Sequence, residues 1–195
     1  AGGGTGMSPW HMMNEWGMPP VYLHSLLYQF AQRLSNRGDY LPALAVAGGF
    51  SFEDHIFKGL AMGAPFVKLV GMARAPVAAA MVGKTIGRTI DTNKVPVYIS
   101  RFGNSKDEIF VTAVELRRKL RDASFDQIPT GALGLYTYYE RLGQGLRQLM
   151  AGSRKFSLEH MSRNDIASLT PEAAEVSGIR YIMDVDREEV DSILG

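Results

Sequence analysis

The sequence predicts a parallel α/β fold followed by a helical tail. Two short apolar runs, residues 41–47 and 66–70, are each closed by glycine, which is typical of buried parallel strands. Helical patterns precede, separate and follow these runs. Helices that alternate with short strands indicate a parallel sheet, because each helix carries the chain back to the same edge. We expect this α/β part over residues 1–103 and a helical extension packed on it over residues 104–195.

Five segments carry the longer helical patterns, and three shorter ones follow. In residues 21–37 apolar side chains recur every three or four positions, and Gly38 marks the end. After the first strand Ser51 is the expected N-cap of a helix that ends at Gly63. A third helix runs from about Pro76 to Ile86. The tail carries long patterns over residues 107–121 and 132–150 and shorter ones near Ser157, Pro171 and Arg187.

The composition excludes several classes of protein. Hydrophobic residues make up 46% of the 195 residues and charged residues 21%, which are the proportions of a globular protein. The 21 Lys and Arg residues nearly balance the 20 Asp and Glu residues, so the protein has no strong electrostatic field that would attract nucleic acid or an anionic membrane. Cysteine is absent, which excludes disulfides and thiolate metal sites and agrees with a reducing cytoplasm. We expect a soluble, cytoplasmic protein without a signal peptide or membrane span.

The first nine residues form a glycine-rich segment with little side-chain bulk. Such segments turn sharply or allow the backbone to approach a ligand. The chain starts with this loop and without Met, so we expect it to be a fragment or a cleavage product of a longer protein.

Both predicted strands are followed by glycine loops that suit a phosphate. Gly48 and Gly49 follow the first strand, and Gly71, Met72 and Ala73 follow the second. In a parallel sheet these loops lie side by side, and their main-chain N–H groups form an anion site next to a helix N-terminus. Arg74 adds a cation to this site. The alternative is that the glycines only make tight turns, and periodicity leaves both interpretations open.

Three motifs resemble the flavin-binding synthase domain of the glutamate synthases in order and spacing. They occupy residues 3–9 (GGTGMSP), 44–49 (LAVAGG) and 59–64 (GLAMGA). Residues 136–142 and 146–150 resemble the terminal helices of that domain, so the similarity covers most of the chain. The resemblance implies the carboxy-terminal half of a (β/α)8 TIM-type barrel that binds FMN, followed by a helical tail.

The resemblance also implies an activity. Reduced flavin would transfer hydride to 2-iminoglutarate, formed from 2-oxoglutarate and ammonia, in glutamate biosynthesis. The catalytic residues would belong to a complementary amino-terminal half of the barrel, supplied in the same chain or by another one. The residues expected at the FMN phosphate are Gly48, Gly49, Gly71, Met72, Ala73 and Arg74, and those near the flavin or the substrate are Gly3, Gly4 and Thr5.

One departure from the family pattern leaves alternatives open. Large glutamate synthases carry a cysteine triplet soon after the last barrel strand, whereas residues 84–98 contain no cysteine and therefore no iron–sulfur ligands. The first alternative is a methylamine–glutamate N-methyltransferase-type subunit on the same scaffold. The second is a non-catalytic assembly subunit, because an unpaired half-barrel exposes strand edges and apolar faces.

The remaining polar and apolar motifs have structural interpretations. His11 follows the glycine loop and could reach an active-site mouth, whereas His24, His55 and His160 are expected to be structural and form no metal site. Glu53 and Asp54 suit the positive end of a helix. Residues 117–119 (RRK) indicate a solvated helix face. The sequence also contains an apolar cluster of Met and Trp residues. We expect it to cover a flavin or a partner surface, or to pack in the core. Its members are Met7, Trp10, Met12, Met13, Trp16 and Met18.

Overall fold

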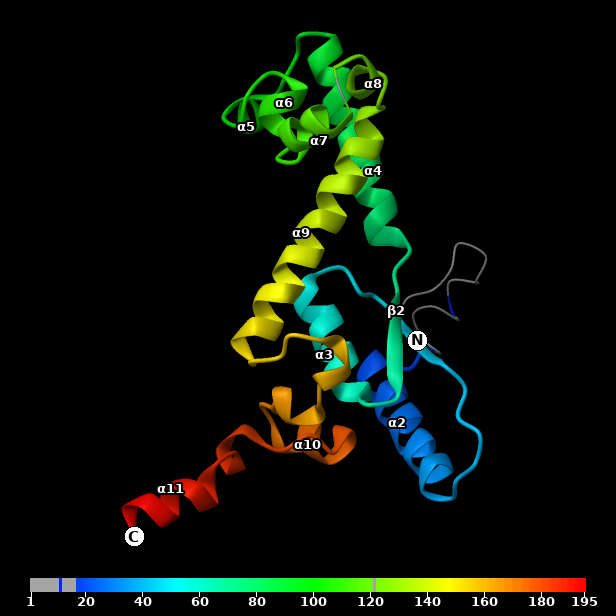
Figure 1. The fold of residues 1–195 in the computed structure, drawn as a ribbon, viewed down its shortest axis with the longest axis vertical. Helices are drawn as coiled ribbons and strands as arrows, with labels where there is room; N and C mark the ends of the chain where they lie inside the picture. Colours follow the sequence, from blue (N-terminus) through cyan, green and yellow to red (C-terminus); the bar gives the residue numbers. More distant parts are fainter. Residues whose placement is uncertain (1–10, 12–16, 121) are drawn as a thin grey trace. The chain divides into compact units, whose positions relative to one another are not determined.

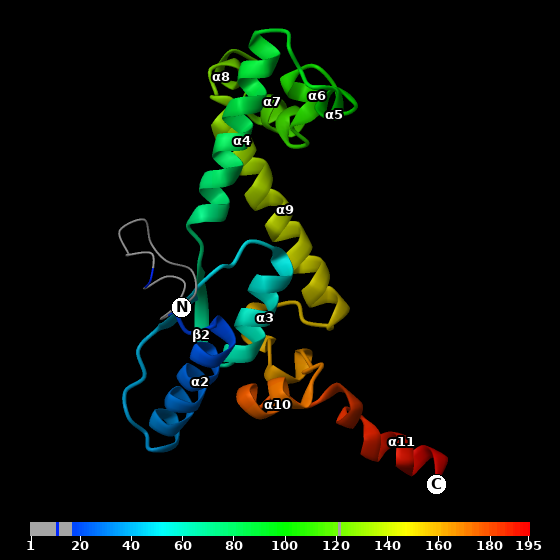
Figure 2. The same cartoon turned by 180° about the vertical axis from the view of Figure 1, so that it is seen from behind.

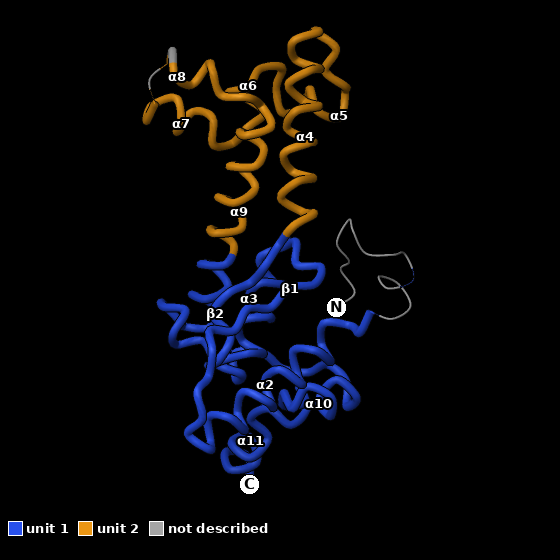
Figure 3. The backbone as a smooth tube through the Cα atoms, turned by 90° about the vertical axis from the view of Figure 1, so that its right-hand side faces the viewer, with its two compact units in different colours: residues 1–72, 146–195 blue, residues 73–145 orange. Residues whose placement is uncertain are grey.

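The chain folds into two compact units. The structure is a computed structural model that describes residue 11, residues 17–120 and residues 122–195 (Figure 1). Unit 1 comprises residues 1–72 and 146–195, and unit 2 comprises residues 73–145 (Figure 3). The predicted division at residue 103 is not tested by these units and stays a prediction. Among the described residues no helix is both long and apolar enough to cross a bilayer.

Unit 1 contains a parallel pair of strands. β1 (Leu44–Ala47) and β2 (Val67–Gly71) are joined by the crossover helix α3 (Glu53–Gly63). Ala47 lies opposite Gly71, so the two strands end side by side. This confirms the predicted strand–helix–strand order with parallel pairing. The described residues form a two-stranded sheet, and a barrel is not shown.

Within unit 1, α3 packs on β2, and two further helices pack beside it. α2 (Pro20–Asn36) matches the predicted first helix, and Gly38 follows it with φ +72°. α2 packs on α3 and on α10 (Pro171–Ser177), as both cartoon views show (Figures 1 and 2). The core of unit 1 consists of Val46, Phe50, Phe57, Leu60, Ala61, Val67, Met150 and Met161.

The start of α3 corrects one prediction. Phe52, not Ser51, occupies the N-cap position, and no side chain caps this end. The Ser51 hydroxyl instead donates to the carbonyl of Gly49 at 3.3 Å, because the chain turns back at this point. Glu53 and Asp54 lie in the first turn, where their charge is favourable to the helix dipole.

Helices are the regular secondary structure of unit 2 among its described residues. Its helices are α4 (Arg74–Asp91), α5 (Val97–Ser100), α6 (Lys106–Ile109), α7 (Ala113–Leu120), α8 (Asp122–Asp126) and the first part of α9 (Thr130–Gly152). The predicted single helix over residues 107–121 is wrong: it is broken after Ile109, where Phe110 adopts an extended conformation and is buried. The core of unit 2 consists of Phe110, Ala113, Phe125 and Leu133.

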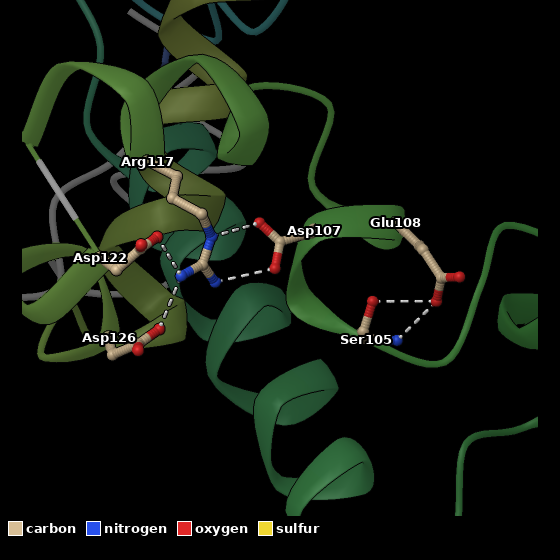
Figure 4. A network of polar contacts seen from close by, with 6 residues as sticks. All are labelled: Ser105, Asp107, Glu108, Arg117, Asp122 and Asp126. Atoms are coloured by element: carbon tan, nitrogen blue, oxygen red, sulfur yellow. Dashed lines mark hydrogen bonds and ion pairs between the residues drawn. The ribbon is translucent and has the colours of Figure 1, made fainter.

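Arg117 organises the polar side of this small core (Figure 4). Its guanidinium donates to both carboxylate oxygens of Asp107, at 3.0 and 2.8 Å, and to Asp122 and Asp126 at 3.2 Å each. It also lies over the Phe125 ring, with Cζ 4.3 Å from the centroid. Arg118 and Lys119 are exposed, as the predicted solvated face implies, whereas Arg117 is half-buried, because three carboxylates and an aromatic ring engage it.

The end of the chain consists of short helices. These are η1 (Leu158–His160), η2 (Arg163–Asp165), α10, η3 (Ile182–Asp184) and α11 (Arg187–Leu194). Helical turns thus form at each of the three expected positions. Thr170 caps α10 by accepting from the Ala173 N–H at 3.2 Å, and Ser162 and Asp165 form a capping box at η2.

Candidate functional site

The two glycine loops meet at the carboxyl end of the parallel strands. Ala47 pairs with Gly71, so Gly48 and Gly49 follow one strand while Met72 follows its neighbour. Gly48 and Gly49 have φ values of +129° and +81°, which L side chains rarely adopt. A Cβ added at Gly49 would meet no atom within 4 Å, so the backbone is open here. The structure therefore brings together four of the predicted phosphate residues.

The other predicted phosphate residues are placed differently. Ala73 and Arg74 belong to unit 2, where Ala73 is the N-cap of α4 and Arg74 its first residue. They are not part of the unit 1 site described here. Gly3, Gly4 and Thr5 lie outside the described residues, as do five members of the Met–Trp cluster: Met7, Trp10, Met12, Met13 and Trp16.

A cavity of about 650 Å³ adjoins Gly48 and Gly49 within unit 1. The start of α2, the β1–α3 loop and α3 form one part of its wall, and residues 166–179 form the other. Its apolar lining includes Pro20, Val21, Phe50, Met62, Ile166, Leu169 and Ile179. Its polar side chains are His24, His55, Lys58, Ser168 and Ser177.

α3 contributes two of these polar groups. His55 and Lys58 are three residues apart, which places them on one face of the helix. The Nδ1 atom of His55 accepts a hydrogen bond from the Ser51 N–H at 3.3 Å, so the proton of the neutral ring resides on Nε2. Lys58 Nζ pairs with Asp54 at 2.7 Å, and both side chains are largely exposed. This hydrogen bond to Lys58 is the main cause that lowers the pKa of Asp54.

α2 contributes a buried histidine. His24 is 7% exposed, and its ring stacks on Phe50 with centroids 5.6 Å apart. Burial lowers the pKa of His24, and a backbone hydrogen bond with Ala47 acts in the opposite direction. The ring is therefore neutral near pH 7. Within the described part of the chain, its Nε2 is buried and has no hydrogen-bond partner.

Arg163 fixes the tail against the helices that line the cavity. Its guanidinium donates to the carbonyl of Met62 at the end of α3 and to that of Ser177 at the end of α10. It lies over the Tyr28 ring of α2, with Cζ 3.8 Å from the centroid. Burial lowers the pKa of this guanidinium. Since Met62 and Ser177 both line the cavity, Arg163 connects two of its walls.

Comparisons with known proteins identify no relative. Family models, curated proteins and solved structures all give no match. Any functional conclusion therefore depends on the arrangement of the residues themselves.

Sequence reasoning identified some residues of this site and missed others. Gly48, Gly49 and Gly71 were found because glycine after an apolar run is a local signal. His24 and His55 were expected to be structural, yet both line the cavity, whereas His11 and His160 are exposed and do not. Lys58 could have been found from its helical spacing to His55. Nothing in the sequence indicates that residues 166–179 form a wall of the cavity.

Proposed function

We propose that the chain is part of an FMN-dependent oxidoreductase of the glutamate synthase type that aminates 2-oxoglutarate reductively. The observation that carries this proposal is the parallel register that pairs Ala47 with Gly71. It sets two glycine loops side by side at the carboxyl ends of strands, where α/β enzymes commonly bind phosphate groups. The resemblance to the synthase domain supplies the identity of the cofactor and the reaction.

The residues at the strand ends fit a phosphate group. The positive φ values of Gly48 and Gly49 and the open space at Gly49 allow a ligand to approach the main-chain N–H groups. Glu53 and Asp54 in the first turn of α3 oppose an anion, but Lys58 balances the charge of Asp54 through their ion pair. A larger side chain at position 71 would be crowded, since a Cβ added to Gly71 would lie 3.2 Å from the Cβ of Ala47.

This chain's share of the chemistry would be to bind and orient the cofactor. FMN, when bound, supplies the hydride-transfer chemistry, and Gly48, Gly49, Gly71 and Met72 would hold its phosphate. The groups that bind the substrate carboxylates would come from the complementary half of the barrel, whose presence is part of the proposal. A methylamine–glutamate N-methyltransferase-type subunit would use the same phosphate site, so a substrate assay separates these two activities.

A non-catalytic assembly subunit is the second candidate. Leu69 in the middle of β2 is 61% exposed, although strands of parallel sheets are normally buried on both faces. A partner that covers Leu69 would give β2 the burial that a parallel strand normally has. The two candidates differ in their dependence on flavin.

Native mass spectrometry of the purified full chain and its companions tests the proposal. We expect one FMN per assembly, released on denaturation. Gly49→Ala should weaken FMN binding roughly tenfold or more, because a methyl group enters the space open to the phosphate. Gly38→Ala is the matched control, since Gly38 also has a positive φ and open space around its Cβ.

The outcomes separate the candidates. Equal FMN binding by both variants would contradict the phosphate site at Gly49. A stable assembly with a companion chain and without flavin would contradict the oxidoreductase and support the assembly subunit.

A further inference from the structure

We propose that the 650 Å³ cavity of unit 1, whose lining includes Gly48 and Gly49, is a binding site for a small monocarboxylate with an apolar body. This inference does not depend on the proposed oxidoreductase activity. It rests on the size of the cavity, on the distribution of charge along its walls and on the way those walls are fixed.

The size and lining are those of a small-molecule site. Ligand pockets typically occupy about 300–1,000 Å³ and are mainly apolar with a few polar groups. The side chains of Val21, Met62, Leu169 and Ile179 give this cavity such a surface. Phe50 adds an aromatic ring that His24 holds in place by stacking at 5.6 Å.

Lys58 is the one Lys, Arg, Asp or Glu side chain among the described residues that line the cavity. No Asp or Glu is among the described residues that line the cavity, whereas Lys58, His55 and His24 all line it. In the neutral form of His55 the Nε2–H is the donor, because Nδ1 accepts from Ser51. Lys58 also pairs with Asp54, and because this pair is exposed, Asp54 is a weak competitor for a ligand. An anionic group is therefore favoured over a cationic one.

The distribution of these groups limits the ligand to one anionic end. His55 and Lys58 both come from α3, while residues 166–169 and Ile179 offer apolar atoms and hydroxyls. The two hydroxyls are occupied: Ser177 donates to the Ala173 carbonyl, and the Oγ atoms of Ser168 and Ser177 lie 3.3 Å apart. A second carboxylate on this wall would lose its hydration without a cationic partner. A dicarboxylate such as 2-oxoglutarate thus fits poorly.

The walls of the cavity are held together by long-range hydrogen bonds. Arg163 connects Met62 with Ser177, and the Ser25 hydroxyl of α2 donates to the Val176 carbonyl of α10. Ser168 and Arg180 are joined by a backbone hydrogen bond of 2.8 Å. A pocket whose walls are fixed in this way requires little reorganisation when a ligand enters.

Isothermal titration calorimetry of the full chain with octanoate tests the inference. We expect saturable binding of octanoate, and at least roughly tenfold weaker binding of octylamine and of 2-oxoglutarate. Lys58→Met should weaken octanoate binding roughly tenfold, because a charge-assisted hydrogen bond is lost. Lys68→Met, which removes an exposed lysine of β2 outside this cavity, should leave the affinity unchanged.

A second pair of variants tests the location. Ala173→Leu places a larger side chain against the cavity and should abolish octanoate binding, whereas Ala174→Leu changes a neighbour on α10 that does not line it. Both variants should retain the circular dichroism spectrum of the parent chain. Loss of binding in both variants, or in neither, would overturn the assignment to this cavity.

Competition with FMN separates this inference from the proposed function. Because Gly48 and Gly49 line the cavity and also belong to the proposed phosphate site, saturating FMN should weaken octanoate binding. Failure of octanoate to bind the flavin-free chain would overturn the inference. Octanoate binding by a chain that binds no flavin would sustain the inference while the oxidoreductase proposal fails.

Discussion

At the scale of single residues, Arg163 is a side chain that joins three elements of unit 1. It donates to the carbonyl of Met62, 101 positions away in sequence, and to that of Ser177. Its stacking on Tyr28 adds a third element to the same contact. The guanidinium suits this position because its planar fork can donate in two directions while its face covers a ring.

Arg163→Met should destabilise unit 1 by about 2 kcal/mol, because two carbonyls lose a charged donor. Arg163→Lys should recover only part of this loss, since an ammonium group cannot reproduce the planar fork. Urea unfolding measures the effect, and Arg180→Met, an exposed arginine of the same segment, is the control. A stability loss for Arg180→Met equal to that for Arg163→Met would show that the contacts of Arg163 are not the cause.

At the scale of elements, α4 and α9 approach each other through glycines within unit 2. A Cβ at Gly134 of α9 would lie 2.7 Å from the carbonyl oxygen of Ala79 and 2.9 Å from the Cα of Gly83. These obstacles are backbone atoms, which cannot rotate away as a side chain can. The contact therefore needs the absence of a side chain at this position.

Gly134→Ala should destabilise unit 2 by about 1–2 kcal/mol, although alanine favours a helix over glycine by about 1 kcal/mol. The clash outweighs the propensity because α4 and α9 must separate to admit the methyl group. Gly152→Ala, at the end of the same helix where nothing lies within 4 Å, should be neutral or stabilising. Thermal unfolding followed by circular dichroism gives both values, and a stabilised Gly134→Ala would refute the close approach.

The elements also show which parts of the structure the sequence could predict. α2 and α9 followed from helical periodicity, and Gly38 marked the end of α2; these are local properties of the chain. The break at Phe110 was not predicted, because the helical pattern of the sequence continues through this residue. The helix is interrupted because the Phe110 side chain is buried against Phe125 and Leu133. The strand ends at Gly48 and Gly71 were predicted because the alternation of elements implies parallel pairing.

The cavity could not be predicted from the sequence, because it depends on contacts between distant residues and not on local patterns. Its second wall comes from residues 166–179, which reach α2 and α3 through contacts between distant residues, such as the hydrogen bond from Ser25 to Val176 across 151 positions. Periodicity carries no information about such pairs. In the sequence, His24 and His55 therefore have the properties of ordinary helical residues, because the cavity that they line is formed together with the distant tail.

At the scale of the whole molecule, the described residues form two cores that share no buried residue. Phe57 is 6% exposed in the core of unit 1, and Phe125 is fully buried in the core of unit 2. α9 contributes to both, with Leu133 in the second core and Met150 in the first. The stability of each core thus depends on its own set of apolar contacts.

We expect the two units to lose their structure separately. Phe125→Ala should remove about 3 kcal/mol or more from unit 2, and Phe57→Ala should do the same to unit 1, since each leaves a cavity in one core only. Hydrogen exchange followed by mass spectrometry measures this along the chain. In Phe125→Ala, faster exchange should include Leu133 and stop within α9 before Met150, whereas Phe57→Ala should produce the reverse pattern. Uniform loss of protection along α9 in both variants would instead mean that the helix couples the two cores into one cooperative unit, because it is the element that contributes buried side chains to each.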